Sequence, residues 1–131
     1  MQYNTLTGTS LKISLLSLGT MMFGGQTNEA DSLQIMDYAY EHGINLFDTA
    51  NVYNQGESER IVGKALKGRR GEIILATKVR GQMGKNPNDA GLSRRNILSA
   101  VDSSLKRLGT DYIDVYYMHA PDYETSLEES L

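Results

Sequence analysis

The sequence predicts an α/β fold in which parallel strands are covered by helices. Short apolar runs alternate with segments whose apolar residues recur at helical spacing, the pattern of repeated strand–helix units. The apolar runs are nearly continuous, as in strands buried on both faces of a parallel sheet. Four such units follow an N-terminal hairpin, and the last helix has only begun at residue 131. We therefore expect one incomplete domain over residues 1–131.

Turn and capping signals place the first elements. Extended segments at 3–6 and 11–14 flank Thr7-Gly8-Thr9-Ser10, which favours a hairpin. Residues 15–18 form the first expected buried strand, which ends at Gly19. Asn28 is a suitable N-cap for a helix that ends at Gly43, and His42 is expected to cap the last turn. A second short strand is expected at 44–47.

The later elements show the same alternation. Glu57 or Ser58 begins a helix that ends at Gly68, and the next strand covers 72–77. The polar loop between Arg80 and Leu92 is too long for a minimal strand–helix turn. Ser93 is expected to cap an amphipathic helix that ends at Gly109. The final strand is expected at 112–118, and a final helix begins at 126–131. The expected apolar stripe of the helix after Ser93 consists of Ile97, Leu98, Val101, Leu105 and Leu108.

Composition excludes several classes of function. The chain is 40% hydrophobic and 22% charged with a net charge of −3, and its largest basic cluster is 67–70, so neither nucleic acid nor an anionic membrane is an expected partner. The absence of cysteine excludes disulfides and thiolate sites, and two isolated histidines do not suggest a metal site. No apolar run approaches the ~20 residues that span a bilayer. The N-terminus lacks signal-peptide features. We expect a cytoplasmic protein.

Polar side chains follow three of the expected strands, at the end where α/β proteins carry their chemistry. Asp48 and Tyr53 follow the strand at 44–47, Lys78 follows 72–77, and His119 follows 112–118. If these strands are parallel neighbours, the four side chains meet at one rim. An ammonium about 4 Å from the Tyr53 hydroxyl would interact with a developing phenolate by ~4 kcal/mol at an effective dielectric near 20. Tyr53 could then serve as a proton donor.

The residues alone leave other interpretations open. Asp48 and Lys78 could form a purely structural ion pair, and His119 could be an ordinary hydrogen-bonded histidine. The segment 56–64 is superficially similar to a phosphate-binding P-loop, but its spacing is wrong and Ala65 stands where Ser or Thr would hold magnesium. The glycines of 19–26 do not form the dinucleotide fingerprint.

Taken together, the motifs resemble the N-terminal part of an aldo-keto reductase. The resemblance covers essentially the whole chain, and its motifs occur in the same order as in the family. Tyr53, Gly56, Ser58 and Glu59, which lie between the segments at 45–50 and 76–78, also match. The segments that carry it are GTMMFGG at 19–25, NLFDTA at 45–50, ATK at 76–78, GLSR at 91–94 and SLKRLGTDYID at 104–114. The resemblance implies the first half of a (β/α)₈ TIM barrel, whose complete form typically needs ≈250 residues.

The resemblance also implies an activity, the NADPH-dependent reduction of an aldehyde or ketone. Tyr53 matches the family's proton donor, Lys78 the cation beside it, and Asp48 the carboxylate that orients Lys78. His119 matches the family's catalytic histidine, which positions the carbonyl. Thr20, Met21 and Gln26, together with Asp48, match positions near the nicotinamide in related proteins.

Gly-Gly-Gln at 24–26 and the long third loop look closest to the branch with bacterial sugar and aldehyde reductases and potassium-channel β-subunits. A cofactor-binding regulatory subunit is therefore the alternative, although channel β-subunits typically carry Asn at the position of His119. The family's adenosine-phosphate clamp and nicotinamide-stacking aromatic lie in the second half of the barrel. The chain is accordingly expected to be a fragment of a reductase, a half that self-associates to cover its open barrel, or an inactive truncated remnant.

Overall fold

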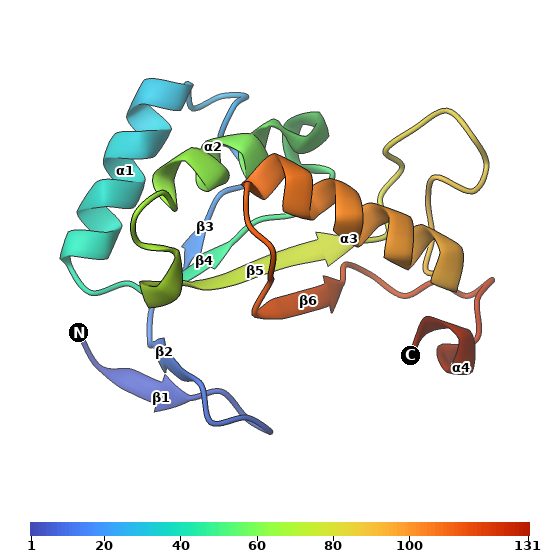
Figure 1. Cartoon of the computed structure of the whole chain (residues 1–131), viewed down its shortest axis with the longest axis horizontal. Helices are drawn as coiled ribbons and strands as arrows, with labels where there is room; N and C mark the ends of the chain where they lie inside the picture. The colour runs from blue at the N-terminus through green and yellow to red at the C-terminus, as the bar shows by residue number, and fades with distance from the viewer.

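A computed structural model describes all 131 residues, and its elements follow the predicted order (Figure 1). A two-stranded antiparallel hairpin comes first, and four parallel strands alternate with helices after it. The strands are β1 (Tyr3–Thr5), β2 (Lys12–Ser14), β3 (Leu18–Gly19), β4 (Leu46–Asp48), β5 (Ile74–Val79) and β6 (Val115–Met118). The helices are α1 (Glu29–Glu41), α2 (Glu57–Ala65), α3 (Arg94–Leu108) and α4 (Leu127–Ser130), and short 3₁₀ turns cover Tyr53–Gly56 and Arg70–Glu72.

The parallel sheet has the strand order β3-β4-β5-β6, so each strand pairs with its neighbour in the chain. Leu18 pairs with Phe47, Phe47 with Leu75, and Lys78 with Tyr117. This is the consecutive order of a β/α barrel. The sheet ends at two strands with no further partner, β3 and β6.

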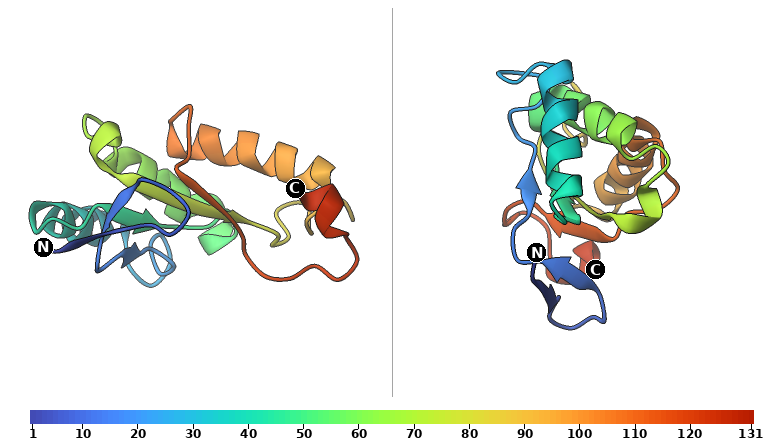
Figure 2. Two further views of the ribbon diagram at one scale, coloured as in Figure 1. Left: turned by 90° about the horizontal axis from the view of Figure 1, so that it is seen from below. Right: turned by 90° about the vertical axis from the view of Figure 1, so that its left-hand side faces the viewer.

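Helices α1, α2 and α3 arch over one face of this curved sheet (Figure 2, right). The hydrophobic core lies between the two layers, where Phe47 and Leu75 from the strands meet helix residues such as Met36, Ile61 and Val62. All five of these side chains are buried. The opposite face of the sheet, which would line the inside of a barrel, carries no such layer.

The hairpin docks below the sheet, at the end where the strands begin (Figure 1). Asn45, just before β4, accepts a hydrogen bond from the Ser14 amide at 2.8 Å and donates to the Lys12 carbonyl at 2.9 Å. Tyr3 donates to the Gly43 carbonyl at 2.9 Å. The hairpin therefore lies away from the carboxyl ends of the strands and leaves them accessible.

The predicted caps are present. Asn28 and Ser93 accept hydrogen bonds from the backbone amides of Asp31 and Asn96, which begins α1 and α3 as expected. His42 is the C-cap residue of α1, and its Nδ1 lies 2.8 Å from the Tyr38 carbonyl. Gly109 takes the left-handed conformation that ends α3.

The structure corrects several element boundaries. The buried strand expected at 15–18 is only Leu18–Gly19, and Leu15 and Leu16 are 54% and 61% exposed. They lie in the bend between the hairpin and β3, where the Leu15 amide donates to the Gln2 carbonyl at 3.0 Å. The strand expected at 72–77 is shifted to Ile74–Val79, which places Lys78 inside it.

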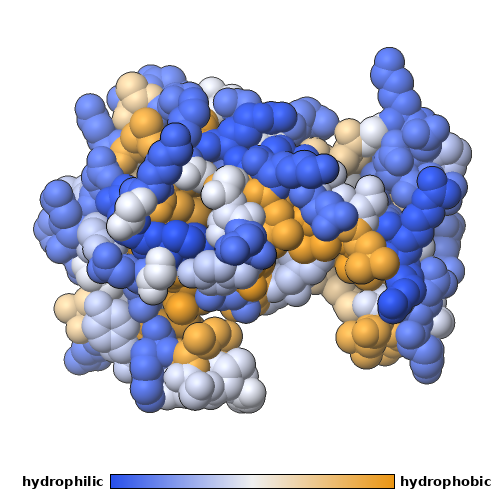
Figure 3. Space-filling view, viewed as in Figure 1, coloured by the Kyte–Doolittle hydropathy of each residue, from blue (hydrophilic) through white to orange (hydrophobic).

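The apolar stripe of α3 is less buried than its spacing suggests. Leu98 is 53% exposed, and apolar surface stays visible along α3 in the space-filling view (Figure 3). The buried residues of α3 are instead Asn96, Ser104 and Leu108, two of them polar. The stripe therefore points partly away from the core of this half-barrel.

No helix in the structure is both long and apolar enough to cross a bilayer.

Candidate functional site

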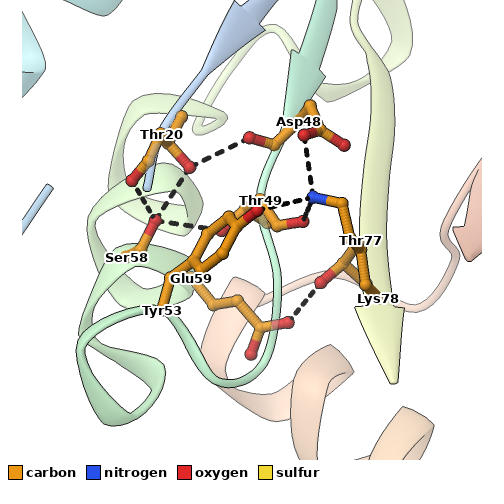
Figure 4. Close-up of polar contacts among 8 residues, drawn as sticks. All are labelled: Thr20, Asp48, Thr49, Tyr53, Ser58, Glu59, Thr77 and Lys78. Carbon is orange, nitrogen blue, oxygen red and sulfur yellow. Dashed lines mark hydrogen bonds and ion pairs between the residues drawn. The ribbon is translucent and has the colours of Figure 1, made fainter. Parts of the chain in front are cut away.

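Lys78 is the centre of the candidate site (Figure 4). Its Nζ donates to Asp48 Oδ2 at 2.7 Å, to the Thr49 carbonyl at 2.7 Å and to the Tyr53 hydroxyl at 3.1 Å. An ammonium has three donors, so all of them are used within the protein. The Tyr53 oxygen accepts one of these bonds and keeps its own proton free for a ligand.

Alternation along β5 orients this lysine. Side chains of successive strand residues point to opposite faces, so buried Thr77 and Val79 face the helices while Lys78 faces the open side of the sheet. Asp48 is the last residue of the neighbouring strand β4. The side chain of Lys78 is 13% exposed and that of Asp48 is 30% exposed. Their ion pair is thus partly shielded from water, which strengthens the Coulomb attraction between them.

Tyr53 is held by an unusual turn. The backbone φ angles of Asn54, Gln55 and Gly56 are 48°, 56° and 88°, three consecutive residues in the left-handed region. A non-glycine residue in this region typically costs of order 1–3 kcal/mol, so the surroundings must hold the turn in place. Asn54 contributes to this, because its amide donates to the carbonyls of Met21 and Phe23 at 3.0 and 2.8 Å. The turn is therefore tied to the loop after β3.

A buried cluster of three hydroxyls lies beneath this turn (Figure 4). Ser58 Oγ lies 2.8 Å from Thr20 Oγ1 and 2.9 Å from Thr49 Oγ1, and it donates to the Thr20 carbonyl at 2.8 Å. The Thr20 hydroxyl also lies 3.1 Å from the Asp48 carbonyl. Since all three side chains are fully buried, the cluster joins the ends of β3 and β4 to the start of α2.

His119 lies directly after β6, and its backbone amide donates to the Val79 carbonyl at 2.9 Å. Its ring meets the Tyr53 ring edge-on, with centroids 5.7 Å apart. Burial lowers the pKa of His119 below its usual value, and the nearby positive charge of Lys78 lowers it further. A neutral imidazole, which can accept or donate a hydrogen bond, is thus favoured beside Tyr53.

The structure brings together the four residues predicted to form the site. Three of them, Asp48, Lys78 and His119, line a pocket of about 390 Å³ on the open side of the sheet. Tyr53 is joined to this group by its hydrogen bond with Lys78 and its edge-on contact with the His119 ring. The pocket walls combine apolar surface with the convergent polar groups of Asp48, Lys78 and His119, the kind of lining that small-molecule sites share. The pocket is lined by Ser17, Leu46, Asp48, Ala76, Lys78, Tyr117, Met118 and His119.

The residues predicted to approach a nicotinamide differ in what they can offer. Met21 and Gln26 are exposed in the loop after β3. The Thr20 hydroxyl is fully buried and engaged with Ser58 and Asp48, so Thr20 supports this loop from beneath. The pocket itself offers apolar surface together with the polar groups of Asp48, Lys78 and His119, a lining compatible with a small, partly polar ring such as a nicotinamide. Among its lining residues the only lysine or arginine is Lys78, whose three donors are already used, so the pocket offers no free cation to a phosphate.

Besides the hydroxyl cluster, two features of the site were missed by sequence reasoning. The Thr49 carbonyl accepts from Lys78, but backbone carbonyls leave no mark in a sequence. Glu59 is a fully buried carboxylate, and its position was detectable, because Glu59, Val62 and Leu66 recur at helical spacing on the buried face of α2. A charged residue on the buried face of a helix indicates that a group of opposite charge or a hydrogen-bond donor is buried next to it.

Comparisons with known proteins agree with this architecture. Residues 15–131 match the model of the aldo/keto reductase family, and the chain belongs to this family. An aldo-keto reductase from Bacillus halodurans, solved in its holo form, superposes with a TM-score of 0.88 at 45% identity, over 99% of this chain and 44% of that one. The chain therefore has the fold of the first strand–helix units of that family's TIM barrel.

Two curated relatives are similarly close. A probable voltage-gated potassium channel subunit beta from Arabidopsis thaliana is 42% identical over 100% of this chain and 41% of its own length. Protein tas from Escherichia coli is 43% identical over 96% of this chain and 40% of its own length. The chain thus spans about two-fifths of the length of these relatives.

Proposed function

We propose that this chain supplies the proton-transfer half of an NADPH-dependent reductase that acts on small aldehydes or ketones. The observation that carries the proposal is the use of all three Lys78 donors, one of them on the Tyr53 oxygen. A bound NADPH would supply the hydride to the carbonyl carbon. Membership of the aldo/keto reductase family and the holo-form neighbour support the choice of cofactor.

The chain's own residues then protonate and orient the carbonyl oxygen. Tyr53 donates its free proton to that oxygen as negative charge develops there. The Lys78 ammonium, 3.1 Å away, stabilises the phenolate left behind, and Asp48 keeps Lys78 in place. A neutral His119, edge-on to Tyr53, directs the carbonyl oxygen by a hydrogen bond from its ring.

Tyr53→Phe tests this assignment in a barrel completed with the remaining strand–helix units of a relative. Carbonyl-dependent oxidation of NADPH should fall by about 10²-fold or more, because the proton donor is lost. NADPH affinity should stay nearly unchanged, since the hydroxyl contributes little to holding the nucleotide. Tyr117→Phe, another tyrosine at the pocket, is the matched control and should retain most of the activity. Full activity in Tyr53→Phe would remove Tyr53 from the mechanism.

A regulatory subunit that binds cofactor without turnover is the second candidate. The identity to a probable potassium channel subunit beta favours it. Cofactor binding with no carbonyl reduction in the completed barrel would support it over the reductase. A barrel that showed neither would favour an inactive remnant.

A further inference from the structure

A second buried network lies on the helix side of β5, opposite Lys78. The Glu59 carboxylate is fully buried. It accepts one hydrogen bond from the Thr77 hydroxyl at 2.6 Å and another from Arg107 Nε at 2.6 Å. Arg107 also donates to Ser104 at 3.2 Å. Glu59 therefore joins three elements, α2, β5 and α3, through one side chain.

Each of these elements holds a part of the candidate site in place. Thr77 directly precedes Lys78 in β5, and Glu59 follows the Tyr53 turn by only three residues. Arg107 packs against the end of that turn, because a Cβ at Gly56 would lie 2.6 Å from the Arg107 Cδ. Figure 4 shows Glu59 bonded to Thr77, next to Lys78 in β5. Glu59 and Arg107 together thus support both β5 and the Tyr53 turn from the helix side of the sheet.

We infer that Glu59 is a positioning residue, which sets the approach of Lys78 to Tyr53 by fixing the start of α2 against β5 and α3. It touches neither Lys78 nor Tyr53 and acts through Thr77 and the turn. The role of Glu59 in proton transfer rests on the function proposed above. The placement of Lys78 relative to Tyr53 by Glu59 does not, because it concerns only the arrangement of side chains within this chain.

The ring of His119 can report this geometry without turnover. The chain has only two histidines, so NMR resolves both, and His42 in the cap of α1 serves as an internal reference. The charged groups that act on His119 are Lys78, Asp48 and Arg80. Glu59 contacts Thr77 and Arg107 and makes no contact with His119, so we expect a change at Glu59 to reach His119 through the positions of these groups or of the Tyr53 ring.

The test is an NMR pH titration of the two histidines in the unsubstituted chain and in Glu59→Gln, monitored through the signals of the ring protons. Glutamine keeps the shape and an acceptor for Thr77 but loses the charge that holds Arg107. We expect the His119 midpoint to rise by roughly half a pH unit as Lys78 moves away, with a changed ring-current shift from Tyr53. The His42 signal should not move.

Glu57→Gln is the matched control, because Glu57 lies on the same helix in an exposed ion pair with Arg60 at 3.3 Å. It should leave His119 unchanged. A folded Glu59→Gln with an unaltered His119 titration and shift, even if less stable, would overturn the inference and leave Glu59 a purely structural residue.

Thr77→Val decides the question if Glu59→Gln does not fold. It removes the hydroxyl that Glu59 binds and keeps the ion pair with Arg107, so the fold has less to lose. We expect a smaller shift of His119 in the same direction, restored in Thr77→Ser, and no shift in Thr77→Val would refute the inference. None of these readouts needs catalysis, so a failure of the reductase proposal in the completed barrel is a separate result.

Discussion

The lowered pKa of His119 makes the stability of the folded chain depend on pH. Its folded pKa lies below the ordinary value of 6.5, first because of burial and then because of Lys78. The unfolded chain therefore takes up this proton at a higher pH than the folded chain. On this account the folded state loses stability as the pH falls through about 6.5 towards the folded pKa, and the cost is complete below that value.

We predict that Lys78→Met raises the pKa of His119 towards its ordinary value, since the largest of the charges that lower it is removed. Histidine NMR titration measures this, with His42 as reference. Urea unfolding between about pH 7.5 and about pH 5.5 should also lose less stability in His119→Gln than in the unsubstituted chain. Equal losses in both would assign the pH dependence to other groups.

The four main site residues were predictable because each lies at or just after the carboxyl end of an apolar strand, where parallel strands bring side chains together. The hydroxyl cluster around Ser58 was not predictable, since serine and threonine near a helix start are ordinary capping residues in sequence. Only the folded chain shows that Thr20, Thr49 and Ser58 are buried against one another. Their mutual hydrogen bonds explain why polar side chains are accepted there.

At the scale of elements, the close approach of α2 and α3 depends on Gly63. A Cβ at this position would lie 2.4 Å from the Leu108 carbonyl oxygen, and a backbone atom cannot move aside as a flexible side chain would. The Gly63 side of α2 thus contacts the backbone of α3 directly. This contact keeps Glu59 and Arg107 within reach of each other.

Gly63→Ala should lower the free energy of unfolding by about 1–2 kcal/mol. Alanine gains roughly 1 kcal/mol of helix propensity, but overpacking against a backbone atom costs about 1–3 kcal/mol and more when neither side can yield. Urea denaturation measures the difference. Gly71→Ala is the control, because a Cβ there meets nothing within 4 Å, and it should change stability by less than about 0.5 kcal/mol. A stabilised Gly63→Ala would show that the helices can separate without cost.

The order of the helices and strands was predictable, but the bend at 15–16, the two 3₁₀ turns and the burial of the elements were not. The helical spacing of 97–108 and the cap at Ser93 located α3, but spacing does not say what covers an apolar stripe. Leu98 stays 53% exposed although both α2 and α4 contact α3. Leu15 and Leu16, whose apolar character predicted a buried strand, likewise stay exposed in the bend before β3.

At the scale of the whole molecule, we predict that this 131-residue chain binds NADPH weakly or not at all by itself. The rim holds the reactive end of the site, but its lysine is fully engaged with Asp48, Thr49 and Tyr53. The pocket lining therefore offers no free cation to the phosphates, and little charge-assisted affinity is expected from it. Calorimetry that gave a micromolar or tighter dissociation constant would contradict this.

The last prediction concerns the open face and edges of the sheet. Strands β3 and β6 have no outer partners, and Leu15, Leu16, Tyr117 and Met118 are 54%, 61%, 43% and 38% exposed near these edges. At ~25 cal/mol per Å², several hundred Å² of such surface left in water forfeits about 10 kcal/mol, comparable to the stability of a domain.

We therefore propose that the isolated chain associates with a second copy, with β6 of one copy meeting β3 of the other. Light scattering should give a mass above that of one chain, and unfolding should depend on protein concentration. Leu16→Asp should weaken the dimer, whereas Tyr38→Asp, on α1 across the sheet, should not. A compact monomer that unfolds cooperatively at all concentrations would exclude this association, because its exposed apolar face would then cost less than its area implies.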